Sequence, residues 1–227
     1  MYRLIVFFLL SAVSVTWAQT DDKVDNYLED QFYVGITYNF LLDKPVNTTQ
    51  RNLSYGLLGG YIKDIPFNSQ RNVGLGIGLG YAVNSYYTNI LGNETASGIE
   101  YMVLEDDVDF EFKRSKIETH LIELPVEFRW RTSNATDYKF WRIYTGIKFG
   151  YVIGARSKFI SDTQKISFTN SDIRKFNYGL TFNFGYNTFN FQAYYALNNL
   201  FDEEVSLLEG GSLDLRPLRI GIVFYIL

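Results

Sequence analysis

The chain has 227 residues, no cysteine and 18% aromatic side chains, a length that suits one sheet or barrel domain better than two full domains. The absence of cysteine excludes a disulfide framework, a thiolate zinc site and a cysteine nucleophile. A formal net charge of −4 offers no electrostatic attraction for nucleic acid. With 19 Phe and 18 Tyr against 4 Pro, the composition favours strands.

Residues 1–18 have the layout of a secretory signal peptide. Met1-Tyr-Arg3 is a short, positively charged start, Leu4–Val15 is apolar, and Ala18 is a small residue before Gln19. An apolar stretch of about 12 residues is too short for a stable membrane anchor, although an N-terminal membrane helix is the alternative. We therefore expect a mature chain that begins near Gln19, with residues 19–30 as a short periplasmic leader.

From residue 31 onward, large apolar residues alternate with small or polar ones. The even positions of Phe32–Leu42 are bulky, and Val73–Val83 has glycine at 74, 76, 78 and 80. A period of two indicates strands. The pattern predicts about eight strands of roughly 10–14 residues, long for a soluble sheet and long enough to cross a membrane with tilt. The eight are Phe32–Leu42, Leu53–Lys63, Val73–Val83, Glu118–Arg131, Phe140–Ile153, Phe176–Tyr186, Phe189–Leu197 and Leu218–Ile226.

The connections between these strands alternate between short and long. The short ones are Ile65–Arg71, Thr132–Lys139 and Asn187–Thr188. The long ones are Asp43–Arg51, Ser85–Ser115, Ala155–Arg174 and Asn198–Asp214. Short turns on one side and long loops on the other are typical of an outer-membrane barrel with both termini in the periplasm. The sequence therefore predicts an all-β fold: an eight-stranded antiparallel transmembrane β-barrel over residues 31–227, in the cell outer membrane.

A soluble lipocalin-type barrel is the alternative, and its bulky residues would point inward. Here the small set contains Gly74, Gly76, Gly78 and Gly80, which suits the inner face of a crowded lumen. The bulky set carries aromatic residues near the expected periplasmic rim, as at a membrane interface. These are Phe32, Tyr61, Trp130, Trp141, Tyr186 and Phe189.

Charged residues fall on the inward face. An eight-stranded barrel is filled by its own side chains, and the short turn after Arg131 would place Glu123 opposite Lys148 and Glu127 opposite Tyr144. Buried charges persist when paired, so we expect a salt-bridged plug, with a proton or ion relay as the alternative, and no general diffusion pore. The inward set is Glu123, Glu127, Arg129, Arg142, Tyr144, Lys148 and Arg219.

The sequence does not provide a complete catalytic set. His120 is the only histidine, and it could act with Glu118 and Ser115 beside a long loop, as in barrel enzymes that modify lipids. Parity instead places His120 on the lipid-facing set, where a structural or headgroup contact is commoner. We therefore predict no catalytic residues and no enzyme.

Two further patterns could suggest ligands. The acidic run Glu105–Glu111 could bind calcium, but it lacks the glycine and distal glutamate of an EF-hand loop. The Gly74–Gly80 run has a period of two and no helix after it, so it does not match a nucleotide-binding loop. We predict no metal, no cofactor and no small-molecule substrate; the expected partners are outer-membrane lipid and other membrane proteins, not nucleic acid.

The middle of the chain resembles a known family. Leu121-Ile-Glu123-Leu-Pro125 leads to the basic turn at Arg129-Trp-Arg131, and Trp141–Gly150 follows with glycine at 146 and 150. This arrangement resembles the PorT-like outer-membrane barrels of Bacteroidota over residues 31–227. The resemblance implies a non-enzymatic accessory component of a type IX secretion or gliding-motility apparatus, with secretion or motility proteins as partners. Pro125, in mid-strand, would mark a bulge or kink.

The last strand, Arg219–Ile226, resembles the C-terminal signal recognised by the bacterial barrel-assembly machinery. Two other functions stay open. One is a structural or surface-interaction barrel that binds a partner through Ser85–Ser115 and Ala155–Arg174. The other is a small lipid-modifying enzyme.

Overall fold

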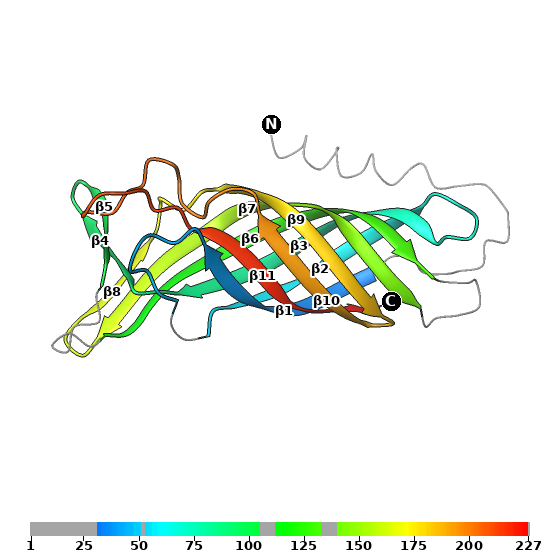
Figure 1. The fold of residues 1–227 in the computed structure, drawn as a ribbon, viewed down its shortest axis with the longest axis horizontal. Helices are drawn as coiled ribbons and strands as arrows, with labels where there is room; N and C mark the ends of the chain where they lie inside the picture. The colour runs from blue at the N-terminus through cyan, green and yellow to red at the C-terminus, as the bar shows by residue number, and fades with distance from the viewer. Residues whose placement is uncertain (1–30, 51–52, 105–111, 133–139, 227) are drawn as a thin grey trace, which may run out of the picture.

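Eight long antiparallel strands close into a barrel (Figure 1). The computed structural model describes residues 31–50, 53–104, 112–132 and 140–226. The predicted signal peptide and leader, and the acidic run at 105–111, lie outside the described residues. Within those residues, no helix is long and apolar enough to span a membrane. The barrel strands are β1 (Gln31–Leu42), β2 (Tyr55–Pro66), β3 (Val73–Tyr87), β6 (Phe112–Arg131), β7 (Trp141–Ser161), β9 (Phe176–Tyr186), β10 (Phe189–Ala196) and β11 (Arg216–Ile226).

The strands pair in the order β6-β3-β2-β1-β11-β10-β9-β7, and pairing of β6 with β7 closes the ring. Strands that follow one another around the wall are paired antiparallel, and β1 pairs with β11 at the seam, where Phe32 lies opposite Ile226. A closed ring leaves no free strand edge along the wall. The predicted fold class, an eight-stranded antiparallel barrel, is confirmed.

The two ends of the barrel differ. At the short-turn end, brief connections join β2 to β3 and β9 to β10; at the long-loop end, the connections hold further strands. These are the hairpin β4 (Ile90–Thr95) and β5 (Gly98–Val103), and β8 (Lys165–Thr169), which pairs with the far end of β7. All three gather beyond the barrel wall at one end (Figure 1).

The sequence pattern missed these three strands and ended two others too early. β6 begins at Phe112 rather than Glu118, and β7 ends at Ser161 rather than Ile153. In these extensions, charged residues replace bulky apolar ones on the outer face while the inner face keeps residues such as Ile117 and Phe159. The backbone ladder continues where the apolar alternation stops.

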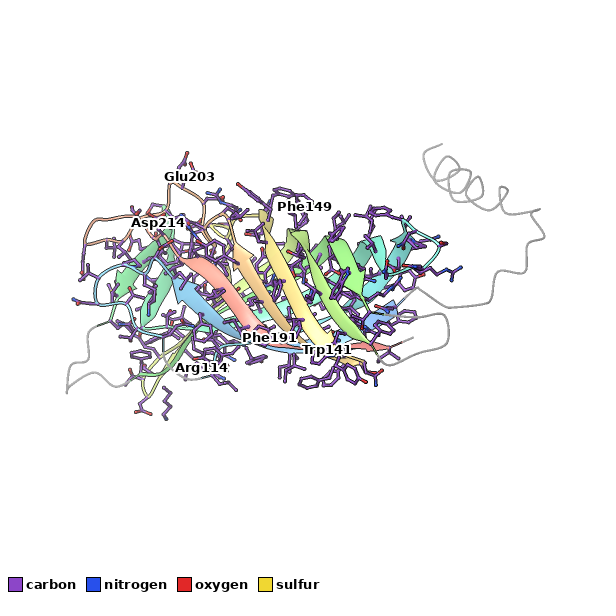
Figure 2. All side chains as sticks on the ribbon, turned by 45° about the vertical axis from the view of Figure 1, so that its right-hand side comes forward. Arg114, Trp141, Phe149, Phe191, Glu203 and Asp214 are labelled. Carbon is purple, nitrogen blue, oxygen red and sulfur yellow. The ribbon has the colours of Figure 1, made fainter. Side chains whose placement is uncertain are left out.

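The outer face of the wall is apolar and the inner face is polar or small. On β9, Leu180 and Phe184 are 49% and 42% exposed, whereas Thr181 and Asn183 are 1% exposed. At about 3.4 Å per residue and a tilt of about 40°, the 11 residues of β9 span on the order of 25 Å. Trp141, Phe149 and Phe191 likewise project from the outside of the wall (Figure 2). This inverts the pattern of a soluble barrel and matches a hydrocarbon environment.

The predicted aromatic rim lies at the short-turn end. All six predicted side chains are exposed on the outer face, and Trp141 stacks on Phe184 with ring centroids 5.3 Å apart. Phe32 likewise contacts Tyr61 across β1 and β2 at 5.2 Å. Rings in this position suit a membrane interface.

The bulge that was one of the two predicted effects of Pro125 is absent between β6 and β7; the predicted kink stays a prediction. β6 and β7 keep one register across it, with Pro125 opposite Lys148, and the register shifts instead between His120 and Leu121. The missing N–H is tolerated because the ladder between β3 and β6 is interrupted beside Pro125. Beside the proline, β6 therefore loses pairing with β3 but keeps its pairing with β7.

The predicted register of β6 and β7 was wrong by two residues. Glu123 lies opposite Gly150 rather than Lys148, and Glu127 lies opposite Gly146 rather than Tyr144. Because side chains alternate with a period of two, an offset of two keeps every residue on its predicted face. The inward set is therefore as predicted although its exact neighbours are not.

Candidate functional site

The lumen near the short-turn end holds a network of buried ion pairs. Asp64, from β2, contacts Arg131 at 2.5 Å and Arg129 at 3.6 Å. Arg129 also contacts Glu127 at 3.3 Å, and its guanidinium lies 4.4 Å from the centre of the Tyr144 ring. These cations are at most 2% exposed, so the carboxylates and ring faces replace the water they have lost.

A second group of ion pairs fills the middle of the lumen. Glu123 accepts a hydrogen bond from Arg219 at 2.8 Å and contacts the Lys148 amine at 3.2 Å. Arg219 also stacks on Tyr194, 3.8 Å from the ring centre. The predicted salt-bridged plug is therefore present, including the predicted contact between Glu123 and Lys148.

Two glycines of β3 make room for this filling. A Cβ atom at Gly76 would collide with the Arg129 guanidinium, and one at Gly80 would collide with the Tyr33 hydroxyl. The glycine run predicted to face a crowded lumen does so at both positions. Its function is to accommodate large side chains from facing strands.

An apolar cluster closes the long-loop end above the charged network. Tyr101, from β5, packs edge-on against Phe201 with ring centroids 5.2 Å apart, and both are at most 1% exposed. The Tyr101 hydroxyl donates to Asn170 at 3.0 Å, and burial raises the pKa of this hydroxyl above its usual value. Leu200, Leu213 and Leu215 belong to the same cluster. The long connections thus form a packed cap.

A small cavity lies in the lumen between the cap and the ion pairs. The cavity beside Tyr194 and Arg219 has a volume of about 20 Å³, which holds about one water molecule. Among the described residues, the buried apolar cap and the ion-paired side chains both lie across the path that a water-filled channel would need. The arrangement suits a barrel that does not conduct solutes.

A groove lies at the long-loop end, between the β4–β5 hairpin, β8 and the last long loop. We call it the loop-end groove; its volume is about 420 Å³. Met102 and Leu208 are 37% and 56% exposed in it. Its lining is Leu91, Asn93, Glu100, Met102, Gln164, Lys165, Ile166 and Leu208. A mixture of exposed apolar and polar side chains is typical of a contact surface for another molecule.

The structure does not assemble the catalytic alternative around His120. His120 lies on the outer face, as parity predicts, with its Nδ1 2.6 Å from the Tyr81 hydroxyl and its Nε2 3.6 Å from Glu118. Ser115 lies on the inner face and donates to the Ile90 carbonyl. The hydroxyl and the imidazole are therefore on opposite sides of β6.

Sequence reasoning missed the loop-end groove and a cluster of cations on the outer extension of β6, β7 and β8. The groove depends on how three loop strands meet, which no local pattern records. On β6 the cations did leave a signal, because Lys116 and Arg114 continue the period of two of the apolar outer residues. On β7 they did not, because the outer positions change from odd (Tyr151, Ile153) to even (Arg156, Lys158) at the register shift opposite His120. The period of two would therefore have extended β6 but not β7.

Comparison with known proteins shows the family of this barrel. The sequence profile of the outer membrane protein beta-barrel domain family matches residues 17–202. The chain belongs to this family. It is therefore an outer-membrane β-barrel protein. No curated protein matches the sequence.

Similar solved structures share little sequence with this outer-membrane barrel. One is Ail, the attachment invasion locus protein of Yersinia pestis, with a TM-score of 0.32 and 14% identity over 86% of this chain and 97% of that chain. Another is a triple mutant of the Rhodopseudomonas blastica porin, with a TM-score of 0.21 and 9% identity over 87% of this chain and 99% of that chain.

Proposed function

We propose that this protein is a non-conducting outer-membrane barrel that works by contacting other proteins through its long-loop end, which faces outside the cell. The observation that carries the proposal is the packed cap around Tyr101 and Phe201, with the loop-end groove beside it. A barrel whose lumen is filled by its own side chains would act through its surfaces. Ordered strands at one end provide a rigid surface there, and rigid surfaces lower the entropic cost of binding.

Site-specific photocrosslinking in living cells tests the contact. A crosslinking residue at Leu208 should form an adduct with one protein, whereas the same residue at Phe191, on the lipid-facing wall, should not. Met102→Asp, on the same groove floor, should abolish the Leu208 adduct without affecting assembly of the barrel. Adducts at Leu208 that persist with Met102→Asp, or no protein adduct at all, would contradict the proposal.

The orientation is tested separately with single cysteines, which the natural chain lacks. Ser97→Cys, in the turn of the β4–β5 hairpin, should react with a membrane-impermeant maleimide in intact cells. Asn68→Cys, in the connection from β2 to β3, should react only after the outer membrane is permeabilised. The reverse pattern would place the long-loop end in the periplasm.

A second candidate is narrower: an accessory component of a type IX secretion or gliding-motility apparatus. The Glu-Leu-Pro element at Glu123–Pro125, followed by a basic turn, supports it because PorT-like barrels of Bacteroidota carry the same arrangement. Deleting the gene and comparing secreted and cell-surface proteins tests this candidate. Joint loss of many exported proteins, with precursors retained in the periplasm, is expected; an unchanged set of exported proteins would remove it.

A further inference from the structure

A group of cations lies on the outer face of the wall, where β6, β7 and β8 extend past the apolar belt. Their side chains line a groove of about 240 Å³, which we call the basic groove. Arg114, at the edge of this group, and Trp141, on the aromatic rim, lie in different parts of the wall (Figure 2). The groove is lined by Lys116, Glu118, Arg156, Lys158, Lys165 and Ser167.

The strand register brings these cations together. Lys116 lies directly opposite Lys158, which in turn lies opposite Ser167 on β8. One pair further along, Arg114 and Lys165 flank Ile160 from the two sides. Like charges directly opposite one another destabilise a sheet, so this placement has a cost that a bound anion would offset.

Little in the described part of the chain neutralises the groove. Glu118 is the one carboxylate in its lining, and it binds the Lys116 amine at 2.5 Å. Arg156 donates to the Ser167 hydroxyl at 2.9 Å, a neutral partner. Repulsion from neighbouring cations, Arg114 first, lowers the pKa of Lys158. An anion that enters the groove would therefore meet several unneutralised cations at once.

The groove is continuous with the lipid-facing wall. On β7, the exposed Tyr151 and Ile153 precede Arg156, which at about 3.4 Å per residue and a tilt of about 40° lies roughly 7–8 Å further along the membrane normal than Ile153. This is about the thickness of the headgroup layer of one leaflet. On β6, Ile122 and His120 lead in the same way to Glu118 and Lys116. A lipid whose chains lie against the apolar residues would place its headgroup at the cations.

We propose that the basic groove binds the phosphate groups of a lipid in the outer leaflet. This rests on the proposed orientation, which puts the long-loop end outside. Guanidinium and ammonium groups bind phosphate oxygens through charge-assisted hydrogen bonds. A lipid is favoured over a soluble anion because the groove opens on the membrane side of the wall, directly above the acyl-chain contacts. The inner face of the same strands is occupied by buried residues such as Ser115 and Ile117.

Binding of purified lipid A to the full-length mature protein in phosphatidylcholine nanodiscs tests the proposal without depending on orientation. Bisphosphorylated lipid A should bind about tenfold more tightly than its dephosphorylated form. Arg156→Gln/Lys158→Gln should remove this preference. Lys44→Gln/Lys113→Gln, which removes the same charge outside the groove, should keep it. Heat-modifiable migration on gels confirms that each variant is folded.

Each other outcome overturns the proposal. If Arg156→Gln/Lys158→Gln still binds bisphosphorylated lipid A more tightly than the dephosphorylated form, or if the natural protein binds both forms equally, the groove does not bind the phosphate groups. Full displacement by inorganic phosphate would identify a site for free phosphate rather than for a lipid. If only a variant with the carboxylates at 105–111 replaced by amides binds lipid A, the chain's own acidic segment is the occupant. Reversed cysteine labelling would overturn the proposed orientation and, with it, the assignment to an outer-leaflet lipid, even where the basic groove still binds lipid A in nanodiscs.

Discussion

Glu123 is the carboxylate on which the middle of the lumen depends, because it contacts both Arg219 and Lys148. Glu123→Gln would leave two buried cations with no negative partner at this point. Removing one partner of a buried ion pair costs about 3–5 kcal/mol, and we expect a loss of that size in the free energy of unfolding by urea in lipid vesicles.

Glu203 provides the control for Glu123. Its side chain is 84% exposed and contacts Arg174 at the surface, where an ion pair contributes at most about 1 kcal/mol. Glu203→Gln should therefore leave the unfolding free energy nearly unchanged. Equal effects of the two substitutions would mean that the lumen network is not a stabilising plug.

Gly80 tests the crowding of the lumen. In Gly80→Ala the new Cβ would meet the Tyr33 hydroxyl, and overpacking costs about 1–3 kcal/mol. Gly154→Ala is the matched control, because its Cβ would meet nothing closer than 3.9 Å. In a Tyr33→Phe background the cost of Gly80→Ala should fall. Equal unfolding free energies for the two alanine variants would argue against tight packing at Gly80.

At the scale of the strand, the outer face of β9 is expected to contact lipid. Leu180 lies near the middle of that strand and is 49% exposed. Leu180→Lys should destabilise the barrel by about 2–4 kcal/mol in a bilayer, the cost of a cation near the midplane. Leu208→Lys, at the long-loop end, should cost little. Unfolding titrations in vesicles measure both, and a tolerated Leu180→Lys would contradict the lipid-facing assignment.

The elements also show what a sequence can and cannot predict here. The eight wall strands followed from the alternation of bulky and small residues, because the membrane imposes that alternation on each crossing. β4, β5 and β8 were missed because they lie beyond the membrane, where Asn93, Glu100 and Lys165 interrupt any apolar period. The β6–β7 register was off by two because the length of a connection does not fix where pairing begins, and residues 131 and 142 begin it.

At the scale of the whole molecule, the polar filling of the lumen and the apolar cap follow one another along the barrel axis, and two grooves lie outside them. Ion pairs around Asp64 and Glu123 fill the lumen, an apolar cap around Tyr101 closes it, and two grooves lie outside the cap and the wall. The lumen charges could be predicted from parity along each strand. The cap and the grooves could not, because they form only where loops distant in sequence meet.

From the filled lumen and its cap we expect a sealed barrel that acts through its surfaces. Conductance across a planar lipid bilayer containing the purified, folded barrel measures whether the lumen is sealed. We predict no stable single-channel steps, both for the natural chain and for Tyr101→Ala, because the ion pairs below the cap still fill the lumen. Reproducible steps from the natural chain, altered by Arg219→Gln, would show an open path through the plug and a barrel that conducts.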